Sequence, residues 1–109
     1  MLNIHKALRL VQTQDERMQV QTILVLLTVA EFGPISMSQL KDTAGLSQSS
    51  VSRNCAALGK IHRKGRPGLG LITATEDPMD RKQKVVKLTT KGENFMAQLR
   101  ATQTKERLN

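Results

Sequence analysis

The chain has 109 residues, enough for one domain with one modest core. Its 17 Lys and Arg outnumber its 9 Asp and Glu and give a formal net charge of +8, whereas two Phe are its only aromatic residues. The charge favours a polyanionic partner, and the scarcity of aromatic rings argues against RNA or single-stranded DNA, whose bases usually stack on such rings. Duplex DNA fits better, and a merely solvated basic surface is the alternative.

Other chemistry finds little support in the composition. The single Cys55 cannot form an internal disulfide, so we expect a reducing, cytoplasmic location. The sequence has neither an apolar run long enough to span a bilayer nor a signal peptide, so no membrane partner is expected. His5 and His62 lack Cys or acidic neighbours at metal-ligand spacing, and no nucleophile or phosphate-loop motif occurs. We therefore expect no metal, no cofactor and no enzymatic activity.

The apolar spacing predicts five helices and one β-hairpin. The first helix covers about residues 3–12. Thr13 or Asp15 can cap the second, which runs to about Glu31. Because the second helix is apolar over most of its circumference, it should be a central helix that is covered on several sides.

The next segment has the spacing of a helix-turn-helix. A very short strand at 35–36 precedes a helix that Ser38 caps and that ends at Gly45. Ser47 then caps a helix over about 48–63. Two helices joined by a short turn with Gly are typical of this motif, which places its second helix in the DNA major groove.

The second helix of this pair carries the candidate base contacts. Val51, Cys55 and Leu58 form an apolar stripe that should face the core. The remaining Ser, Gln, Asn, Arg and Lys side chains suit hydrogen bonds to base edges or phosphates, although some of the Ser residues can serve only as caps. The candidate DNA contacts on the two helices are Ser38, Gln48, Ser49, Ser50, Ser52, Arg53, Asn54, Lys60 and Arg63.

A flexible connection over 64–70 leads to strands at about 71–75 and 83–88, joined by a turn over 76–82. A last helix begins at Thr89 or Thr90 and fades after Thr102.

The hairpin supplies a second group of candidate contacts. Arg81 and Lys82 are cations at its tip that can reach phosphates or the minor groove. Asp80 can hold an Arg by bidentate hydrogen bonds, while Asp77 and Pro78 shape the turn. A helix-turn-helix followed by a cationic hairpin predicts a winged helix-turn-helix fold.

Two segments resemble the MarR family of transcriptional regulators. They are the helix LSQSSVSRNCAALGKIHRKG and the wing DPMDRKQKVVKLTTKG, and the similarity extends over about residues 17–99. It implies a mainly α fold with a small β-hairpin, that is, a winged helix-turn-helix with short N- and C-terminal dimerisation helices. In a single domain of residues 1–109, the core would be 17–99 and the dimerising segments 1–14 and 93–109.

The resemblance further implies a homodimer that reads a pseudo-palindrome, with Arg81 in the minor groove and Asp80 bracing a nearby Arg. The chain departs from the family at Lys82, where the family has a second Arg, and at Gly59, where it often has an acidic residue. The link to the wing is long and the terminal helices are short. Without Tyr or Trp, the family's pocket for small-molecule effectors is not expected here.

The resulting hypothesis is a sequence-specific regulator of transcription that binds double-stranded DNA. Its reading helix, about 48–63, would enter the major groove, and its wing, about 71–88, the minor groove. Two alternatives stay open, a non-specific architectural DNA binder and a winged-helix module that docks on the transcription machinery. The sequence does not predict the operator, the sign of regulation or the pathway.

Overall fold

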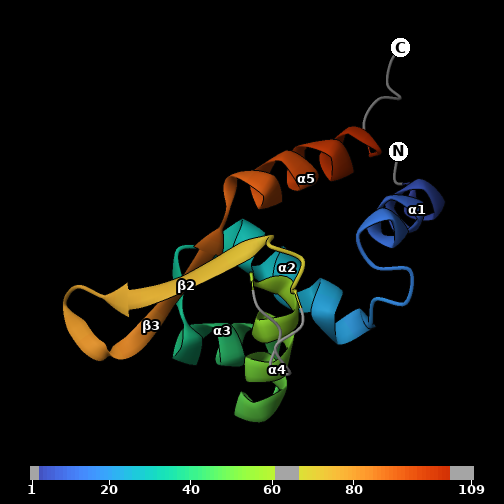
Figure 1. Cartoon of the computed structure of the whole chain (residues 1–109). Helices are drawn as coiled ribbons and strands as arrows, with labels where there is room; N and C mark the ends of the chain where they lie inside the picture. The colour runs from blue at the N-terminus through green and yellow to red at the C-terminus, as the bar shows by residue number, and fades with distance from the viewer. Residues whose placement is uncertain (1–2, 61–66, 104–109) are drawn as a thin grey trace.

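The computed structural model describes residues 3–60 and 67–103, in the arrangement of Figure 1. Its helices are α1 (Ile4–Gln14), α2 (Val20–Phe32), α3 (Met37–Ala44), α4 (Gln48–Leu58) and α5 (Thr90–Ala101). Its strands are β1 (Ile35–Ser36), β2 (Ile72–Asp77) and β3 (Asp80–Leu88), which form an antiparallel sheet in the order β1-β3-β2. The predicted fold class, mainly α with a small β-hairpin, is confirmed.

Helix α2 is the central helix, as predicted. Its residues Val25, Leu26 and Val29 are at most 1% exposed, and the helix packs against α3, α4 and β3. The face of α2 opposite the core is open in the described structure, however, and exposes Val20, Leu24 and Leu27. The expectation that α2 is covered on several sides therefore holds for its core-facing sides alone.

The boundary between α1 and α2 differs from the prediction. Helix α1 continues to Gln14, and Asp15 is its C-cap, with a backbone amide that donates to the carbonyl of Val11. The Asp15 carboxylate accepts from the amide of Arg17 at 3.0 Å, so it stabilises a turn and does not cap α2. Helix α2 begins only at Val20, after a Gln19 that makes no side-chain cap.

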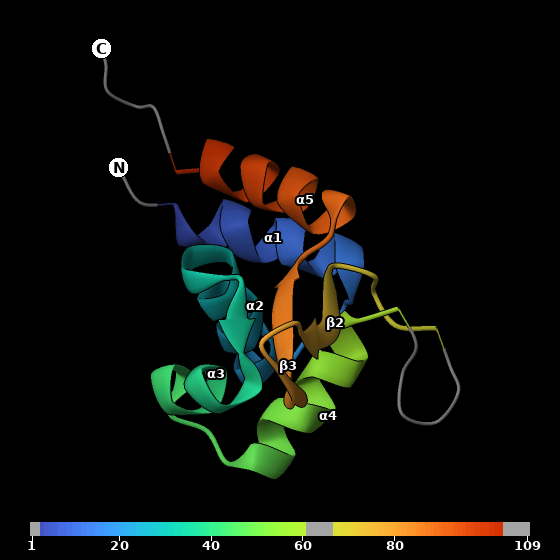
Figure 2. The same cartoon turned by 90° about the vertical axis from the view of Figure 1, so that its left-hand side faces the viewer.

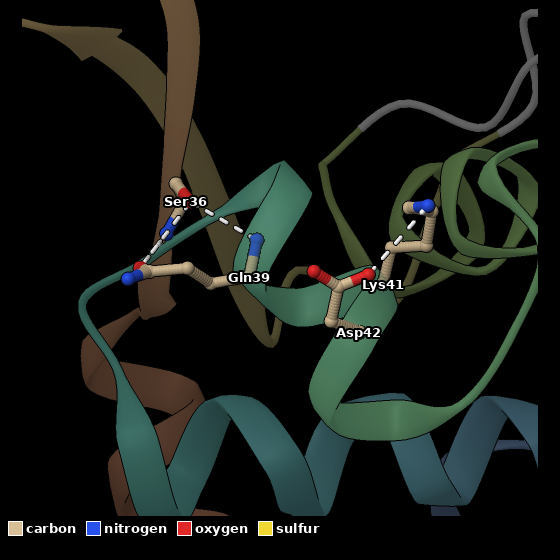
Figure 3. Close-up of polar contacts among 4 residues, drawn as sticks. All are labelled: Ser36, Gln39, Lys41 and Asp42. Atoms are coloured by element: carbon tan, nitrogen blue, oxygen red, sulfur yellow. Dashed lines mark hydrogen bonds and ion pairs between the residues drawn. The ribbon is translucent and has the colours of Figure 1, made fainter.

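Helix α3 is capped by Ser36, so the prediction of Ser38 as the cap is wrong. The Ser36 hydroxyl accepts from the amide of Gln39 at 3.1 Å, and the Gln39 side chain accepts from the amide of Ser36 (Figure 3). This reciprocal pair is a capping box. Figure 3 also shows the ion pair of Lys41 and Asp42 at 3.6 Å, which is exposed and contributes little to stability. The predicted break at Gly45 is confirmed by a left-handed φ of 69°.

Helix α4 ends at Leu58, five residues before the predicted end. The amides of residues 68–71 donate to the carbonyls of the last two residues of α4, of its C-cap and of the residue after the cap, and they thereby satisfy acceptors that a helix end leaves open. The pairs are Gly68 with Lys60 at 3.0 Å, Leu69 with Ala57 at 3.0 Å, Gly70 with Gly59 at 2.9 Å and Leu71 with Leu58 at 2.8 Å. We call residues 68–71 the return segment. The predicted flexible connection over 64–70 is thus ordered by hydrogen bonds from Gly68 onward.

The hairpin is longer, and its turn tighter, than predicted. Strand residues Asp77 and Asp80 face each other, so the turn consists of Pro78 and Met79 and not of residues 76–82. The Asp77 carboxylate accepts from the amide of Met79 at 2.9 Å, and the Asp80 carboxylate accepts from the amide of Lys82 at 3.1 Å. These local hydrogen bonds fold the tip, which allows both strands to continue through the polar residues.

The start of α5 docks on the start of β2. The Thr89 hydroxyl caps α5 by accepting from the amide of Gly92 at 3.0 Å, and it donates to the carbonyl of Gly70 at 2.6 Å. A Cβ atom on Gly92 would lie 2.0 Å from the carbonyl oxygen of Leu71, so this contact requires glycine. The predicted start at Thr89 or Thr90 is confirmed.

Helices α1 and α5 lie at the end of the molecule opposite α3 and α4, where the start of α1 meets the end of α5 (Figures 1 and 2). Two hydrogen bonds of 2.9 Å join their outer ends, from the Asn3 amide to the Gln103 side chain and from that side chain to the Asn3 carbonyl. Val11 of α1 and Phe95 and Met96 of α5 are buried. None of the described helices is long and apolar enough to cross a bilayer.

Candidate nucleic-acid interface

Helices α3 and α4 form the two arms of a helix-turn-helix. The turn between them consists of Gly45, Leu46 and Ser47. The Ser47 hydroxyl accepts from the amide of Ser50 at 3.1 Å and so caps α4, as predicted. Leu46 is half-buried and packs against the core. The capped N-terminal half of α4 lies beside α3 at the lower end of the molecule in Figure 2.

Four of the predicted contact residues on α4 are exposed: Gln48, Ser49, Ser52 and Arg53. We call these four residues the reading face. They occupy the first two turns of the helix, next to its positively polarised N-terminus. Ser49 also lies 3.3 Å, oxygen to oxygen, from the Ser47 hydroxyl. Their amide, hydroxyl and guanidinium groups can donate hydrogen bonds to base edges and phosphates.

Two other predicted contacts point the opposite way, and the expectation that they face outward is wrong. Ser50 is 5% exposed and Asn54 is 6% exposed. They face α2, where the Thr22 hydroxyl donates to the Asn54 side chain at 2.6 Å and the Ser50 hydroxyl donates to the Gln21 side chain at 2.8 Å. The spacing held the signal, because residues 50, 54 and 58 fall four apart on one side of a helix, and Leu58 is fully buried.

Cys55, which the sequence assigns to the apolar stripe, is half-buried and packs against the core cluster. Burial raises the pKa of its thiol from the ordinary 9.0 to about 11. The thiol therefore stays protonated and unreactive near neutral pH, as a small apolar residue would.

A groove of about 350 Å³ separates the helix-turn-helix from the wing. Three lysines from two elements line this groove. Lys41 belongs to α3, and Lys82 and Lys84 belong to β3. None of the described residues that line the groove is acidic, so it can accept an anionic chain. The full lining is Met37, Ser38, Lys41, Gln48, Val51, Ser52, Lys82, Gln83 and Lys84.

Sequence reasoning missed Lys41 and Lys84 as site residues. Lys84 lies two positions after Lys82 in the same cationic stretch of β3, and this proximity was a signal in the sequence. Strand alternation was not that signal, because Gln83 between the two lysines also lines the groove and the register with β2 shifts there. Lys41 carried no comparable signal, because only the packing of α3 beside β3 brings it to the groove.

The remaining predicted residues have different places. Ser38 is exposed in the first turn of α3 and lines the groove, and Lys60 is exposed just beyond α4. Asp80 is exposed at the wing tip. Arg81 lies between Asp80 and Lys82 in β3, and its side chain is outside the described part of the structure. Arg63 also lies outside the described residues.

A second hollow, of about 440 Å³, lies between α1 and the start of α2. Its lining contains neither Phe, Tyr nor Trp and includes two carboxylates, Asp15 and Glu16. Among the residues that the structure describes, no group of three His, Cys, Asp or Glu could hold a metal ion.

The arrangement of α3, α4 and the β2–β3 hairpin defines a winged helix-turn-helix protein. Known structures narrow this class to a MarR-like winged helix. A MarR-like transcriptional regulator from Thermotoga maritima has 27% sequence identity and a TM-score of 0.63, over 79% of this chain. A MarR transcriptional regulator from Methanosarcina mazei has 16% identity and a TM-score of 0.70, over 87%.

The crystal structure of MarR gives the same result, with 17% identity and a TM-score of 0.63 over 77% of the chain. No protein-family model matches the chain, and no curated protein matches its sequence. The chain spans 56%, 55% and 61% of the lengths of the MarR, Thermotoga and Methanosarcina proteins. The resemblance to the MarR family is thereby confirmed at the level of the fold.

Proposed function

We propose that the protein is a transcriptional regulator that binds specific sequences of double-stranded DNA. The observation that carries this proposal is the groove in which Lys41, Lys82 and Lys84 converge directly beside the reading face. A phosphate backbone that runs through the groove would place the base edges of the adjacent major groove against α4. The MarR-like fold and the names of its neighbours, which are transcriptional regulators, support the same function.

In this proposal α4 contacts the bases, and the wing contacts phosphates and the minor groove. Arg53 and Gln48, which present a guanidinium and an amide, read bases in the major groove, and Ser49 and Ser52 add shorter contacts. The wing carries Lys82 and Arg81 toward phosphates and the minor groove. Ser38, Lys60 and Arg63 supply further contacts to the sugar-phosphate backbone of the DNA. Ser50 and Asn54 are left out of this set because they are buried against α2.

We further propose that the protein acts in the cytoplasm as a homodimer whose terminal helices form the interface. Ile4 and Leu8 of α1 are 54% and 50% exposed and lie one helical turn apart. An isologous contact between two such surfaces would place one reading helix on each half of a pseudo-palindrome. The proposal includes no small-molecule effector.

The proposed function is tested by selecting bound duplexes from a random pool at about 0.15 M salt and sequencing them. We expect an enriched inverted repeat with half-sites about one helical turn (~34–36 Å) apart. Binding without enrichment would indicate an architectural DNA binder, and absence of binding would indicate a protein-docking module. Either result contradicts the proposal.

The same selection, repeated with two matched variants, tests the reading face. Arg53→Ala should cost about 1–3 kcal/mol of binding free energy on the selected duplex and relax the preference at one base position. The control is Arg9→Ala, which removes the same charge from α1, at the opposite end of the molecule. Arg9→Ala should leave the selected sequence unchanged. Equal effects of the two variants would show that α4 does not read bases.

A further inference from the structure

A chain of hydrogen bonds links α2 to the hidden side of α4. The Thr22 hydroxyl donates to the side-chain oxygen Oδ1 of Asn54 at 2.6 Å, and the side-chain nitrogen Nδ2 of Asn54 donates to the backbone oxygen of Ser50 at 2.9 Å and lies 3.3 Å from its hydroxyl. The Ser50 hydroxyl donates onward to the side-chain oxygen of Gln21 at 2.8 Å. We call Gln21, Thr22, Ser50 and Asn54 the α2–α4 bridge.

Most of the buried polar residues in the described structure belong to the bridge. Four polar residues are buried there, namely Thr22, Thr28, Ser50 and Asn54, and three of them belong to the bridge. Every buried polar side-chain atom in this part of the chain has a hydrogen-bond partner. A fully satisfied polar network fixes one geometry, because its hydrogen bonds are directional, whereas apolar contacts tolerate small displacements.

The bridge lies on the same two turns of α4 that carry the reading face. Ser50 and Asn54 are one turn apart, and they alternate along the helix with the exposed reading face. Since successive helical residues are rotated by about 100°, fixing Ser50 and Asn54 also fixes the direction of the side chains between and beside them. The C-terminal half of α4 has other supports, the buried Leu58 and the return segment. The N-terminal half is held by the bridge, by Val51, by the Ser47 cap and by its contacts with α3.

We infer that the α2–α4 bridge sets the rotation of the reading helix and thereby the DNA sequence that the protein prefers. Its members are positioning residues that do not touch DNA themselves. This inference rests on the proposed function. Loss of the bridge should leave attraction to phosphates intact, because Lys41, Lys82 and Lys84 lie outside it. It should weaken the distinction between the correct sequence and other sequences.

The test compares two isosteric variants of α2. Thr22→Val removes the hydroxyl that anchors Asn54, and Thr28→Val is the matched control. Both threonines are buried, at 7% and 6% exposure, but the Thr28 hydroxyl bonds only to the carbonyl of Leu24 in its own helix. The measured quantities are the affinity for the selected duplex, the affinity for a scrambled duplex and the melting temperature. Ser50→Ala, which removes the hydroxyl that donates to Gln21, provides a second variant.

For Thr22→Val and Ser50→Ala we expect the ratio of specific to scrambled affinity to fall about tenfold, the size expected when base contacts are disturbed. Affinity for the scrambled duplex and the ratio for Thr28→Val should change by less than about twofold. If both threonine variants lower melting temperature alike and neither changes the ratio, the bridge is only structural and the inference fails. If the wild-type protein selects no sequence, the proposed function has failed instead.

Discussion

Cys55 is the one thiol of the chain, and its environment makes its chemistry predictable. Burial raises its pKa from 9.0 to about 11, so the unfolded chain ionises at lower pH than the folded one. The contribution of Cys55 to stability is therefore complete below pH 9 and is lost as the pH rises from 9 to 11.

At pH 8 the native thiol should react with a thiol reagent roughly a hundredfold more slowly than the unfolded chain, because its thiolate fraction is smaller by that factor. The measurement is the labelling rate with and without denaturant. A Cys55→Ala variant should also show a shallower fall in stability between pH 9 and 11. Native labelling within about threefold of the denatured rate would contradict this account.

At the scale of single residues, the sequence predicted the role of a side chain better than whether that side chain faces the core or the solvent. Ser47 as a cap and Cys55 as an apolar residue follow from local rules, and both are confirmed. Ser50 and Asn54 were placed outside because polar residues are usually exposed. Their hydrogen bonds to Gln21 and Thr22, about 30 positions earlier in the chain, could not be predicted from the local sequence, although the spacing of residues 50, 54 and 58 did mark the buried side of the helix.

At the scale of elements, the junction of α5 with β2 offers a sharp test. Gly92→Ala would put a Cβ atom 2.0 Å from the Leu71 oxygen, which already accepts from the amide of Thr89. We expect a loss of about 1–3 kcal/mol in the free energy of unfolding, since this overpacking outweighs the better helix propensity of Ala. Chemical denaturation measures the change.

The matched control is Asn94→Ala, at an exposed position of the same helix two residues later. Asn94→Ala should leave the free energy of unfolding unchanged or raise it slightly, because Ala favours the helix and the exposed side chain at this position makes no packing contact to lose. If Gly92→Ala is as stable as the control, α5 can shift away from β2 without cost, and the close approach is not needed.

The elements themselves were largely predictable, because apolar spacing and caps act within a few residues. All five helices, the short strand at 35–36 and the hairpin occur as expected. The errors lie at boundaries that distant groups decide. Helix α4 stops early because the return segment takes its last carbonyls, and the hairpin is longer because Asp77 and Asp80 fold its tip.

At the scale of the whole molecule, the position of charge should matter more than its sum. Replacing Lys41, Lys82 and Lys84 by Ala should reduce the slope of log affinity against log salt by about 3, roughly one unit for each lost phosphate contact. The control replaces Lys6, Arg9 and Arg100 of α1 and α5. It removes the same charge at the opposite end.

Binding of each variant to one duplex is measured over a range of salt concentrations. The control should keep a slope within about one unit of the wild type. If both triple variants lose the same slope, affinity follows net charge alone and the groove is not the DNA path. This outcome would favour an architectural or non-specific binder.

The site as a whole was only partly predictable from the sequence. The net charge and the wing motif indicated a DNA-binding protein, and the exposed residues of α4 lie beside the wing. The groove was not predictable, because it exists only where α3, α4 and β3 meet. The pairing of α1 with α5 through Asn3 and Gln103 joins residues 100 positions apart, beyond the reach of periodicity.

The return segment has a consequence for the entropy of association. Its amides bond to the carbonyls of residues 57–60 at and just beyond the end of α4, and it leads directly into β2, so α4 and the wing are held together before any ligand arrives. A partner that contacts both elements would not need to order one against the other. No freedom of α4 relative to the wing then has to be lost on binding, and more of the contact energy is retained as affinity.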